Sequence, residues 1–152
     1  MSQTSLIFDF PGPVYGALKK YADPALRITA GGFLIPHGAQ KLFGWFGGYG
    51  LEGTAGYFEE TLGFSDGLLA VLAGGSIEFF GGILLAFGLF TRPVAAIIAG
   101  FLLFALTFHL GNGFIWTDMG YEYPLMWAIL ASTFIIRGGG KYSLDHLIGK
   151  EF

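Results

Sequence analysis

The sequence contains no cysteine among its 152 residues. This absence excludes disulfide bonds, thiolate-bound metals, iron–sulfur clusters and thiol redox chemistry within the chain itself. Charged residues are also scarce: Asp, Glu, Lys and Arg make up 12% of the chain, whereas soluble domains carry about 25%. The formal net charge is −3, so no nucleic-acid partner is expected.

Apolar residues and glycine take the place of the missing charges. The chain is 53% hydrophobic and contains 26 glycines and 17 phenylalanines, and its mean hydropathy is +0.61. Glycine lets helices approach each other closely inside a bilayer, and apolar side chains face the lipid. The composition is therefore typical of a helical membrane protein.

Four segments are apolar enough to be candidate membrane spans, each of which needs roughly 20 residues. They cover residues 24–43, 68–90, 94–110 and the shorter 123–136. The predicted fold class is therefore all-α, an integral membrane bundle of four transmembrane helices.

The remaining residues complete the predicted organisation. Residues 1–23 are expected to form a cytoplasmic or interfacial N-terminal segment that lacks the apolar core of a signal peptide. Residues 24–147 form the membrane domain and residues 148–152 a cytoplasmic tail. The outer segment 44–63 is predicted to be an amphipathic lid with a short helix, because apolar residues recur there at helical spacing, namely Leu51, Ala55, Phe58 and Leu62.

The distribution of basic residues predicts the orientation of the spans. All Lys and Arg residues except Lys41 fall on one side of the four-span arrangement. The other side holds acidic residues, among them Glu52, Glu59, Glu60 and Asp118. Because cytoplasmic loops of membrane proteins are enriched in Lys and Arg, both termini are predicted to be cytoplasmic.

A glutamate lies in the middle of the second span. Gly67, Gly74, Gly81 and Gly88 recur every seven residues, which predicts one stripe along the helix. Glu78 lies inside or beside this stripe, where a second helix is expected to approach, so its carboxyl should point into the bundle. It is either a functional group that carries a proton or a protonated structural residue, and both interpretations stay open.

The first span carries three polar residues. His37 and Lys41 are one helical turn apart and share a face, and Lys41 is either a ligand-binding group or an interfacial anchor. Pro36 has no backbone N–H to donate to the carbonyl of Gly32, so a kink is expected. Arg27 is interpreted as an anchor at the cytoplasmic end, with a place in a cytoplasmic-side polar cluster as the alternative.

The third and fourth spans bring further polar groups to the outer half of the bundle. His109 ends the third span and Glu122 begins the fourth. Each alone is explained as a hydrated residue near the membrane surface. Together with His37 and Glu78, however, they are expected to line one cavity that opens toward the outer half of the membrane, with Lys41 at its mouth.

Several motifs occur in one order along the chain: RITAGGFLIPHGAQKLFGWFGG, LEGTAGYFEE, LAGGSIEFFGGILLAFGLFTRPVA, HLGNGF, GYEYPL and GGGKYSLDHL. In this order and spacing the chain resembles the DoxX family of small four-helix bacterial membrane proteins. The resemblance covers about residues 24–147 and implies a place in the bacterial inner (plasma) membrane. The family pattern maps onto Arg27, His37, Gly38, Lys41, Glu78, Arg92, His109 and Glu122.

The resemblance also implies redox biology, because members resemble the small subunit of a thiosulfate:quinone oxidoreductase or accompany other redox proteins. The first functional hypothesis is therefore a membrane protein that binds a quinone or similar carrier, as a quinone-linked oxidoreductase or a subunit of one. His37 or Glu78 would move the proton and Lys41 would stabilise a developing oxyanion. The expected cofactor-binding residues are His109, Glu122, Phe33, Trp45 and Phe108.

Two alternatives stay open. The protein is a non-catalytic accessory or assembly subunit of a larger membrane redox complex, or it binds a metal or haem through His37, His109, Glu78 and Glu122. The metal hypothesis is the weaker one, because these residues form no fixed-spacing ligand motif. The expected partners are the lipid bilayer and other membrane or redox subunits. The sequence does not determine the substrate, the cofactor or whether the chain forms a homo-oligomer.

Overall fold

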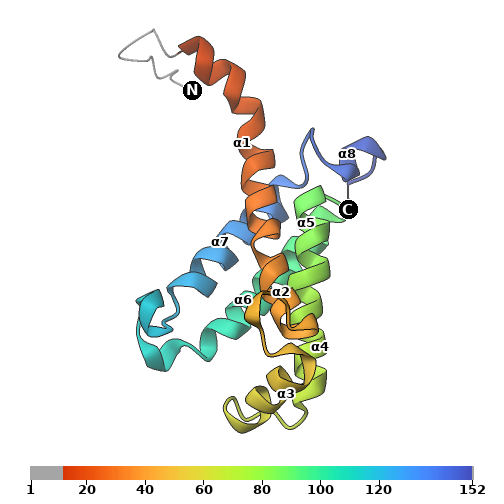
Figure 1. Cartoon of the computed structure of the whole chain (residues 1–152). Coiled ribbons are helices and arrows are strands. Elements are labelled where there is room, and N and C mark those ends of the chain that lie inside the picture. Colours follow the sequence, from red (N-terminus) through yellow and green to blue (C-terminus); the bar gives the residue numbers. More distant parts are fainter. Residues whose placement is uncertain (1–11, 152) are drawn as a thin grey trace.

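The computed structural model describes residues 12–151. The regular secondary structure in this range is helical, and no strand occurs in it. The all-α prediction is therefore confirmed. Four helical rods joined by shorter connections make up most of the chain (Figure 1). The first eleven residues of the predicted N-terminal segment and Phe152 of the predicted tail lie outside the described residues.

The first rod consists of α1 (Gly12–Gly32) and α2 (Leu34–Phe43), with a break at Phe33. The break is next to the carbonyl of Gly32, which loses its usual helical donor because Pro36 has no N–H. The kink expected at this proline is therefore confirmed. The rod ends at Gly44, whose φ of 70° is the left-handed conformation in which glycine closes many helices.

α1 begins well before the predicted start of the first span. It contains Pro24 in its interior and extends back to Gly12, so residues 12–23 are continuous with the span. The predicted start of the first span therefore lies inside a longer helix, whose first part belongs to the predicted N-terminal segment. The backbone hydrogen bond that Pro24 removes would have ended on the carbonyl of Lys20, on an exposed part of the helix where water replaces it. In Figure 1 this part of α1 projects away from the other rods.

The second rod is continuous and consists of α4 (Gly67–Ser76), the π-helical turn η2 (Ile77–Gly81) and α5 (Gly82–Phe87). Asp66 begins it, because its carboxylate accepts a hydrogen bond of 2.9 Å from the backbone N–H of Leu69. A π turn widens the helix by one residue and is often found at functional sites. Here it contains Glu78.

The third and fourth rods are α6 (Thr91–Thr107) and α7 (Glu122–Arg137), which pack against each other. Their connection contains two short 3-10 turns, η3 (Leu110–Asn112) and η4 (Trp116–Asp118). After α7 the chain returns toward the start of α6 and forms the short helix α8 (Leu144–Leu147).

The segment between the first two rods contains a 3-10 turn, η1 (Trp45–Gly47), and the helix α3 (Gly50–Glu60). The short helix predicted in the outer segment is therefore confirmed. α3 packs on α4 and α2. The carboxylate of Glu59 accepts a hydrogen bond of 2.8 Å from the backbone N–H of Gly67 and so ties α3 to the start of the second rod.

Apolar side chains from all four rods form the core at the place where the rods meet. The largest of them include Leu34 on α2, Leu85 on α5, Ile98 on α6 and Phe134 on α7. From this core the α6–α7 pair diverges from α2 and α4 toward the end of the molecule that carries α3 (Figure 1). We call the end of the bundle that carries α8 the closed end, and the end that carries α3, where the rods diverge, the open end.

Glycines let the first and second rods touch backbone to backbone. A Cβ atom on Gly82 would lie 2.7 Å from the carbonyl oxygen of Gly31, and one on Gly38 would lie 2.7 Å from that of Gly75. Both distances are too short for any side chain. These contacts hold α1 and α2 against η2 and α5.

The predicted stripe of four glycines is only partly right. Gly74 and Gly81 face α6, but Gly67 contacts α3 and Gly88 packs against Arg27. The seven-residue spacing fails as a guide because the neighbours of the rod change along its length. The inward position predicted for Glu78 is confirmed, since the residue is buried.

One rod in the described part of the chain, Gly67–Phe87, is long and apolar enough by itself to cross a membrane. α6 is apolar but has 17 residues, and at 1.5 Å per residue it is about 25 Å long. α7 has 16 residues, and the break at Phe33 divides the first rod. The four-span arrangement therefore stays a prediction.

Candidate functional site

A large cavity lies between the diverging halves of the bundle. Its volume is about 1200 Å³. Side chains of α2, α4 and η2 line one side, those of α6 and α7 line the other, and two residues of α3 also line it. Most of the lining is apolar or aromatic. A cavity of this size and character suits a ring compound with an apolar tail.

An ion pair lies in the wall of this cavity. The ammonium of Lys41 on α2 donates a hydrogen bond of 2.5 Å to the carboxylate of Glu78 in η2. The Lys41 side chain is 24% exposed and that of Glu78 is 9% exposed. The backbone contact at Gly38 fixes this geometry, because it holds α2 directly on the π turn. The pair brings opposite charges to an otherwise apolar surface.

His37 lies one turn before Lys41 and lines the same cavity. Its side chain is exposed to this space. No hydrogen bond joins its ring to another residue of the described chain, so both ring nitrogens are free to contact a ligand or water. The structure thus brings together the three residues that were predicted to be catalytic, His37, Lys41 and Glu78.

His109 lines the cavity from the opposite side, just after α6. Its Nδ1 donates a hydrogen bond of 2.7 Å to the carbonyl oxygen of Met119. Because a carbonyl can only accept, this contact places a proton on Nδ1 and leaves Nε2 available. Asn112 donates to the same carbonyl at 3.2 Å. His109 is therefore both part of the cavity wall and part of the loop that shapes it.

Glu122 does not line the cavity, contrary to prediction. Its carboxylate accepts a hydrogen bond of 3.1 Å from the backbone N–H of Trp116 and so stabilises the connection between α6 and α7. The position of Glu122 at the start of the fourth predicted span suggested a place in the cavity. The first turn of α7, however, directs its side chain back to its own loop. The role in ligand binding predicted for Glu122 has no geometric support.

Two of the three predicted aromatic residues line the cavity. Phe33 does so at the break of the first rod, and Phe108 at the end of α6. Trp45 does not. It packs instead on Phe43, with ring centroids 5.1 Å apart, and on Phe79 at 6.4 Å. The reason is that α2 ends at Gly44 and the chain turns there, so Trp45 leaves the face that His37 and Lys41 share.

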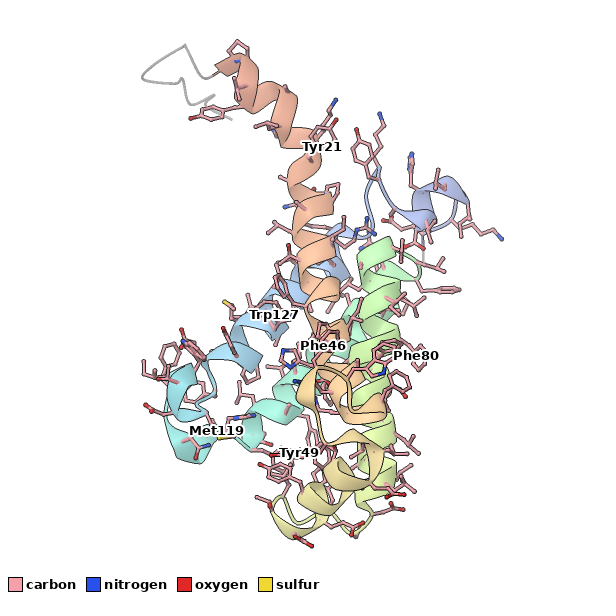
Figure 2. The ribbon with its side chains drawn as sticks, viewed as in Figure 1. Tyr21, Phe46, Tyr49, Phe80, Met119 and Trp127 are labelled. Carbon is pink, nitrogen blue, oxygen red and sulfur yellow. The ribbon has the colours of Figure 1, made fainter. Side chains whose placement is uncertain are left out.

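Sequence reasoning missed Trp127 on α7. Its indole N–H donates a hydrogen bond of 3.1 Å to the carbonyl oxygen of Ala30, and its ring meets that of Phe33 edge to face at 5.8 Å. Trp127 lines the cavity and links α7 to α1. Figure 2 shows it in the central part of the molecule. A tryptophan one turn inside a predicted span, away from the membrane surface, was the signal that it has a buried partner.

The acidic and histidine side chains do not form a metal site of three or more ligands within residues 12–151. His37 and His109 line opposite sides of the cavity, Glu78 is paired with Lys41, and Glu122 holds its own loop. The four metal candidates therefore do not converge as the metal hypothesis required.

The closed end of the bundle holds a second polar cluster. Arg27 is 1% exposed and Asp145 is 2% exposed. The Arg27 guanidinium donates to the carbonyl oxygens of Tyr142, at 2.6 Å, and of Leu85, at 3.5 Å. The interpretation of Arg27 as a membrane-surface anchor is therefore wrong, and the alternative, a place in a polar cluster, is confirmed.

Asp145 was not singled out in the sequence. Its carboxylate accepts hydrogen bonds from the backbone N–H groups of Phe90 and Thr91, at 2.8 and 2.9 Å, and from the Thr91 hydroxyl at 2.6 Å. The C-terminal segment thus caps the start of α6 from a distance of more than fifty residues in sequence, and no local pattern predicts such a contact.

Comparison with known proteins agrees with this architecture. The model of the DoxX family matches residues 22–110. This chain belongs to the DoxX family. The matched residues include the first rod from residue 22 onward, the second and third rods, α3, and the residues His37, Lys41, Glu78 and His109. DoxX proteins are membrane-associated proteins of bacteria, which agrees with the composition and with the apolar Gly67–Phe87 rod.

A relative of this DoxX chain is found in Haemophilus influenzae. It is 36% identical over 110 residues, and the match covers 66% of this chain and 82% of the relative. That protein is described only as "Uncharacterized protein", so it adds no information on activity. No solved structure matches the chain.

Proposed function

We propose that this DoxX protein crosses the bacterial inner membrane with four helical rods and has both ends on the cytoplasmic side. Large apolar side chains project outward from all four rods, for example Ile28, Leu69, Leu103 and Ile129. In the apolar window of the second rod only 33% of the residues are buried, which suits a helix that faces lipid. Basic residues other than Lys41 lie toward the end that carries α8, as the orientation requires.

Within this arrangement we propose that the cavity binds a quinone-like compound, an amphipathic ring with polar oxygens. The observation that carries the proposal is the Lys41–Glu78 ion pair in the wall of a 1200 Å³ cavity that is mainly apolar and aromatic. The apolar lining suits the ring and tail, and the ion pair with His37 supplies polar groups for the oxygens.

The residues suggest a division of roles. The Lys41 ammonium stabilises negative charge on a ligand oxygen. Glu78, held by Lys41, and His37, which has free ring nitrogens, exchange protons with the ligand. Phe33 and Phe108 contact the ring from the first and third rods. His109 contributes its Nε2 from the loop that it helps to fold.

Ligand binding is measured on the purified protein in lipid nanodiscs with a short-chain ubiquinone analogue. The indoles of Trp116 and Trp127 line the cavity, so a bound quinone should quench their fluorescence. His37→Ala and Glu78→Gln are expected to weaken binding about tenfold or more, which corresponds to about 1.4 kcal/mol. Both variants should stay folded in the membrane.

Matched controls come from the same residue types outside the cavity. His146→Ala in α8 and Glu52→Gln in α3 replace exposed side chains that do not line it, so quenching should be unchanged. If the wild-type protein binds no quinone, or if His37→Ala and Glu78→Gln bind as tightly as these controls, the proposal is wrong. The polar residues would then serve only the packing of an accessory or assembly subunit.

A further inference from the structure

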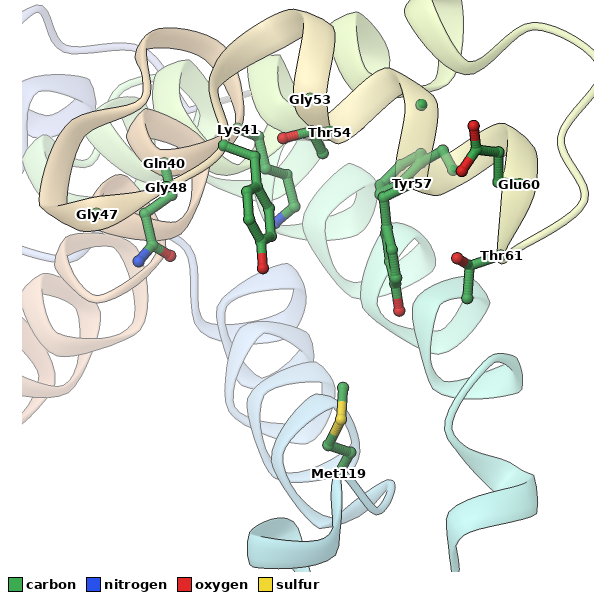
Figure 3. A pocket seen from close by; sticks show the side chains of 13 residues that line it. Gln40, Lys41, Gly47, Gly48, Gly53, Thr54, Tyr57, Glu60, Thr61 and Met119 are labelled. Atoms are coloured by element: carbon green, nitrogen blue, oxygen red, sulfur yellow. The ribbon is translucent and has the colours of Figure 1, made fainter.

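A second, smaller cavity of about 680 Å³ lies beside the first. It is bounded by α3, by the end of α2 with the Gly47–Gly48 turn, and by Met119 of the α6–α7 connection (Figure 3). Four residues line both cavities, and the only charged one is Lys41; the others are Tyr57, Phe58 and Met119. Lys41 therefore lies at the boundary between the two spaces.

The smaller cavity differs from the larger one in chemistry. Polar side chains of Gln40, Thr54, Tyr57, Glu60 and Thr61 line it, and Figure 3 shows Lys41, Thr54 and Tyr57 around the same space. Tyr57, Glu60 and Thr61 are exposed, so these groups border the surrounding solvent. The polar lining continues inward from them to Lys41.

Thr54 is the deepest of these polar residues. It is only 6% exposed, yet its hydroxyl makes no hydrogen bond to another residue of the described chain. The Thr54 hydroxyl oxygen keeps some accessible surface, because Arg27 Nε is the one fully buried side-chain nitrogen or oxygen without a hydrogen-bond partner within residues 12–151. Water is the usual partner of a hydroxyl that bonds to no protein group. Thr54 and the partly exposed ammonium of Lys41 thus provide polar contacts for water at the inner end of the cavity.

We propose that the smaller cavity is an aqueous vestibule through which water on the α3 side of the membrane reaches Lys41. Water enters past Glu60 and Thr61, contacts Thr54 and meets the Lys41–Glu78 pair from the side opposite the larger cavity. The role of this vestibule rests on the proposed function, because the pair connects the two cavities only if a ligand occupies the larger one.

The Lys41–Glu78 pair can pass a proton from the ligand to this water and return to its original protonation state. A ligand hydroxyl gives its proton to the Glu78 carboxylate, so the ligand O–H bond breaks and a carboxyl O–H bond forms. The ligand oxygen keeps the electron pair of the broken bond as an oxyanion. The Lys41 ammonium loses a proton to vestibule water. Glu78 then returns its proton to the neutral Lys41 amine. The pair regains its charges, and one proton has moved from ligand to water.

The absence of cysteine from the chain makes the test direct. Single-cysteine variants Lys41→Cys and Thr54→Cys are treated with a charged, membrane-impermeant methanethiosulfonate in right-side-out and inverted membrane vesicles. Both should be labelled only from the side on which Glu52→Cys, at the exposed surface of α3, is labelled. The side chains of Thr and Cys are similar in volume, so Thr54→Cys tests the proposal even if Lys41→Cys does not fold.

Two glycines offer matched ways to fill each space separately. Gly56 on α3 lines only the smaller cavity and Gly100 on α6 only the larger one, and a Cβ at either position meets no atom within 4 Å. Gly56→Trp should slow the labelling of Thr54→Cys about tenfold or more, because a thiol closed off from water reacts slowly. Gly100→Trp should leave the labelling unchanged and abolish quenching by the ubiquinone analogue.

The outcomes separate the two proposals. Both proposals are supported if Gly100→Trp loses quinone binding while Gly56→Trp keeps it, and if only Gly56→Trp slows the labelling of Thr54→Cys. If the wild-type protein binds no quinone but shows the expected labelling, the vestibule proposal stands and the quinone proposal is wrong. The vestibule is overturned if both cysteines stay unlabelled while Glu52→Cys reacts, or if Gly56→Trp does not slow their labelling.

Discussion

The two ends of the bundle each place a basic side chain near a carboxylate, but they use it differently. At the closed end Arg27 and Asp145 are almost completely buried, and their hydrogen bonds go to backbone groups and to Thr91. At the open end Lys41 and Glu78 bond to each other and remain in contact with two cavities. Figure 2 shows Tyr49 and Met119 at this open end and Tyr21 at the other.

The difference follows from what surrounds each pair. Around Arg27 the C-terminal segment, α5 and the start of α6 leave no space, so the charge serves to join three segments of the chain. Near Lys41 the α6–α7 pair has diverged from α2 and α4, so the Lys41 ammonium borders a cavity. The first environment stabilises the fold, and the second suits a ligand.

The largest effect is expected from removing the carboxylate of the closed end. Asp145→Ala deletes three hydrogen bonds and leaves Arg27 buried without a nearby opposite charge. The free energy of unfolding should fall by about 3 kcal/mol or more, because hydrogen bonds to a charged acceptor contribute about 1.5–3 kcal/mol each. Thermal unfolding in detergent measures it. Asp23→Ala, which removes an exposed partner of Arg137, is the control, and an equal effect of the two would contradict the assignment.

The next effect concerns the contact that positions the open-end pair. Gly38→Ala places a Cβ atom against the backbone of Gly75 and Phe79, where neither neighbour can move as a flexible side chain would. We expect a loss of about 1–3 kcal/mol from overpacking and weaker quinone quenching, because α2 is pushed off the π turn. Gly32→Ala, with no atom within 4 Å of its Cβ, should be neutral or slightly stabilising. Similar melting temperatures for both variants would show that Gly38 is not a close contact in solution.

Removing one member of the open-end pair should cost less than removing Asp145. Lys41→Met leaves Glu78 without its partner, and about 1–3 kcal/mol of stability should be lost. The double variant Lys41→Met/Glu78→Gln should recover most of this loss, because no unpaired charge remains, but it should not bind the quinone analogue. A double-mutant cycle of unfolding midpoints measures the coupling. Additive effects of the two substitutions would mean that the pair does not exist in the membrane.

The smallest effect is expected at Glu122. Glu122→Gln weakens one charge-assisted hydrogen bond to the backbone of Trp116, so stability should fall by about 0.5–1.5 kcal/mol. Quinone quenching should be unchanged, because the residue does not line the cavity. A tenfold loss of affinity in this variant would restore the role that its position in the sequence suggested.

Several features followed from the sequence because they depend on local rules. Glycine and phenylalanine content, long apolar segments and the helical spacing in residues 44–63 predicted an all-helical chain with a short helix between the first two rods. Pro36 predicted the break at Phe33, since a missing N–H acts on a carbonyl four residues away wherever the helix lies. The shared face of His37 and Lys41 and the inward direction of Glu78 were predictable for the same reason.

Other features depend on contacts between residues far apart in the chain, and only the tertiary structure decides them. The partner of Lys41 is 37 residues away, the anchor of Trp127 is 97 residues away, and Asp145 caps a helix that begins 54 residues earlier. The turn at Gly44 removed Trp45 from the cavity, because one left-handed residue redirects every side chain that follows. The glycine stripe fails at Gly67 and Gly88, because other segments replace α6 as the neighbours there. The sequence by itself determined which segments are helical and which residues are polar within them. Packing of the rods determined that one charged pair is enclosed and the other lies beside open space.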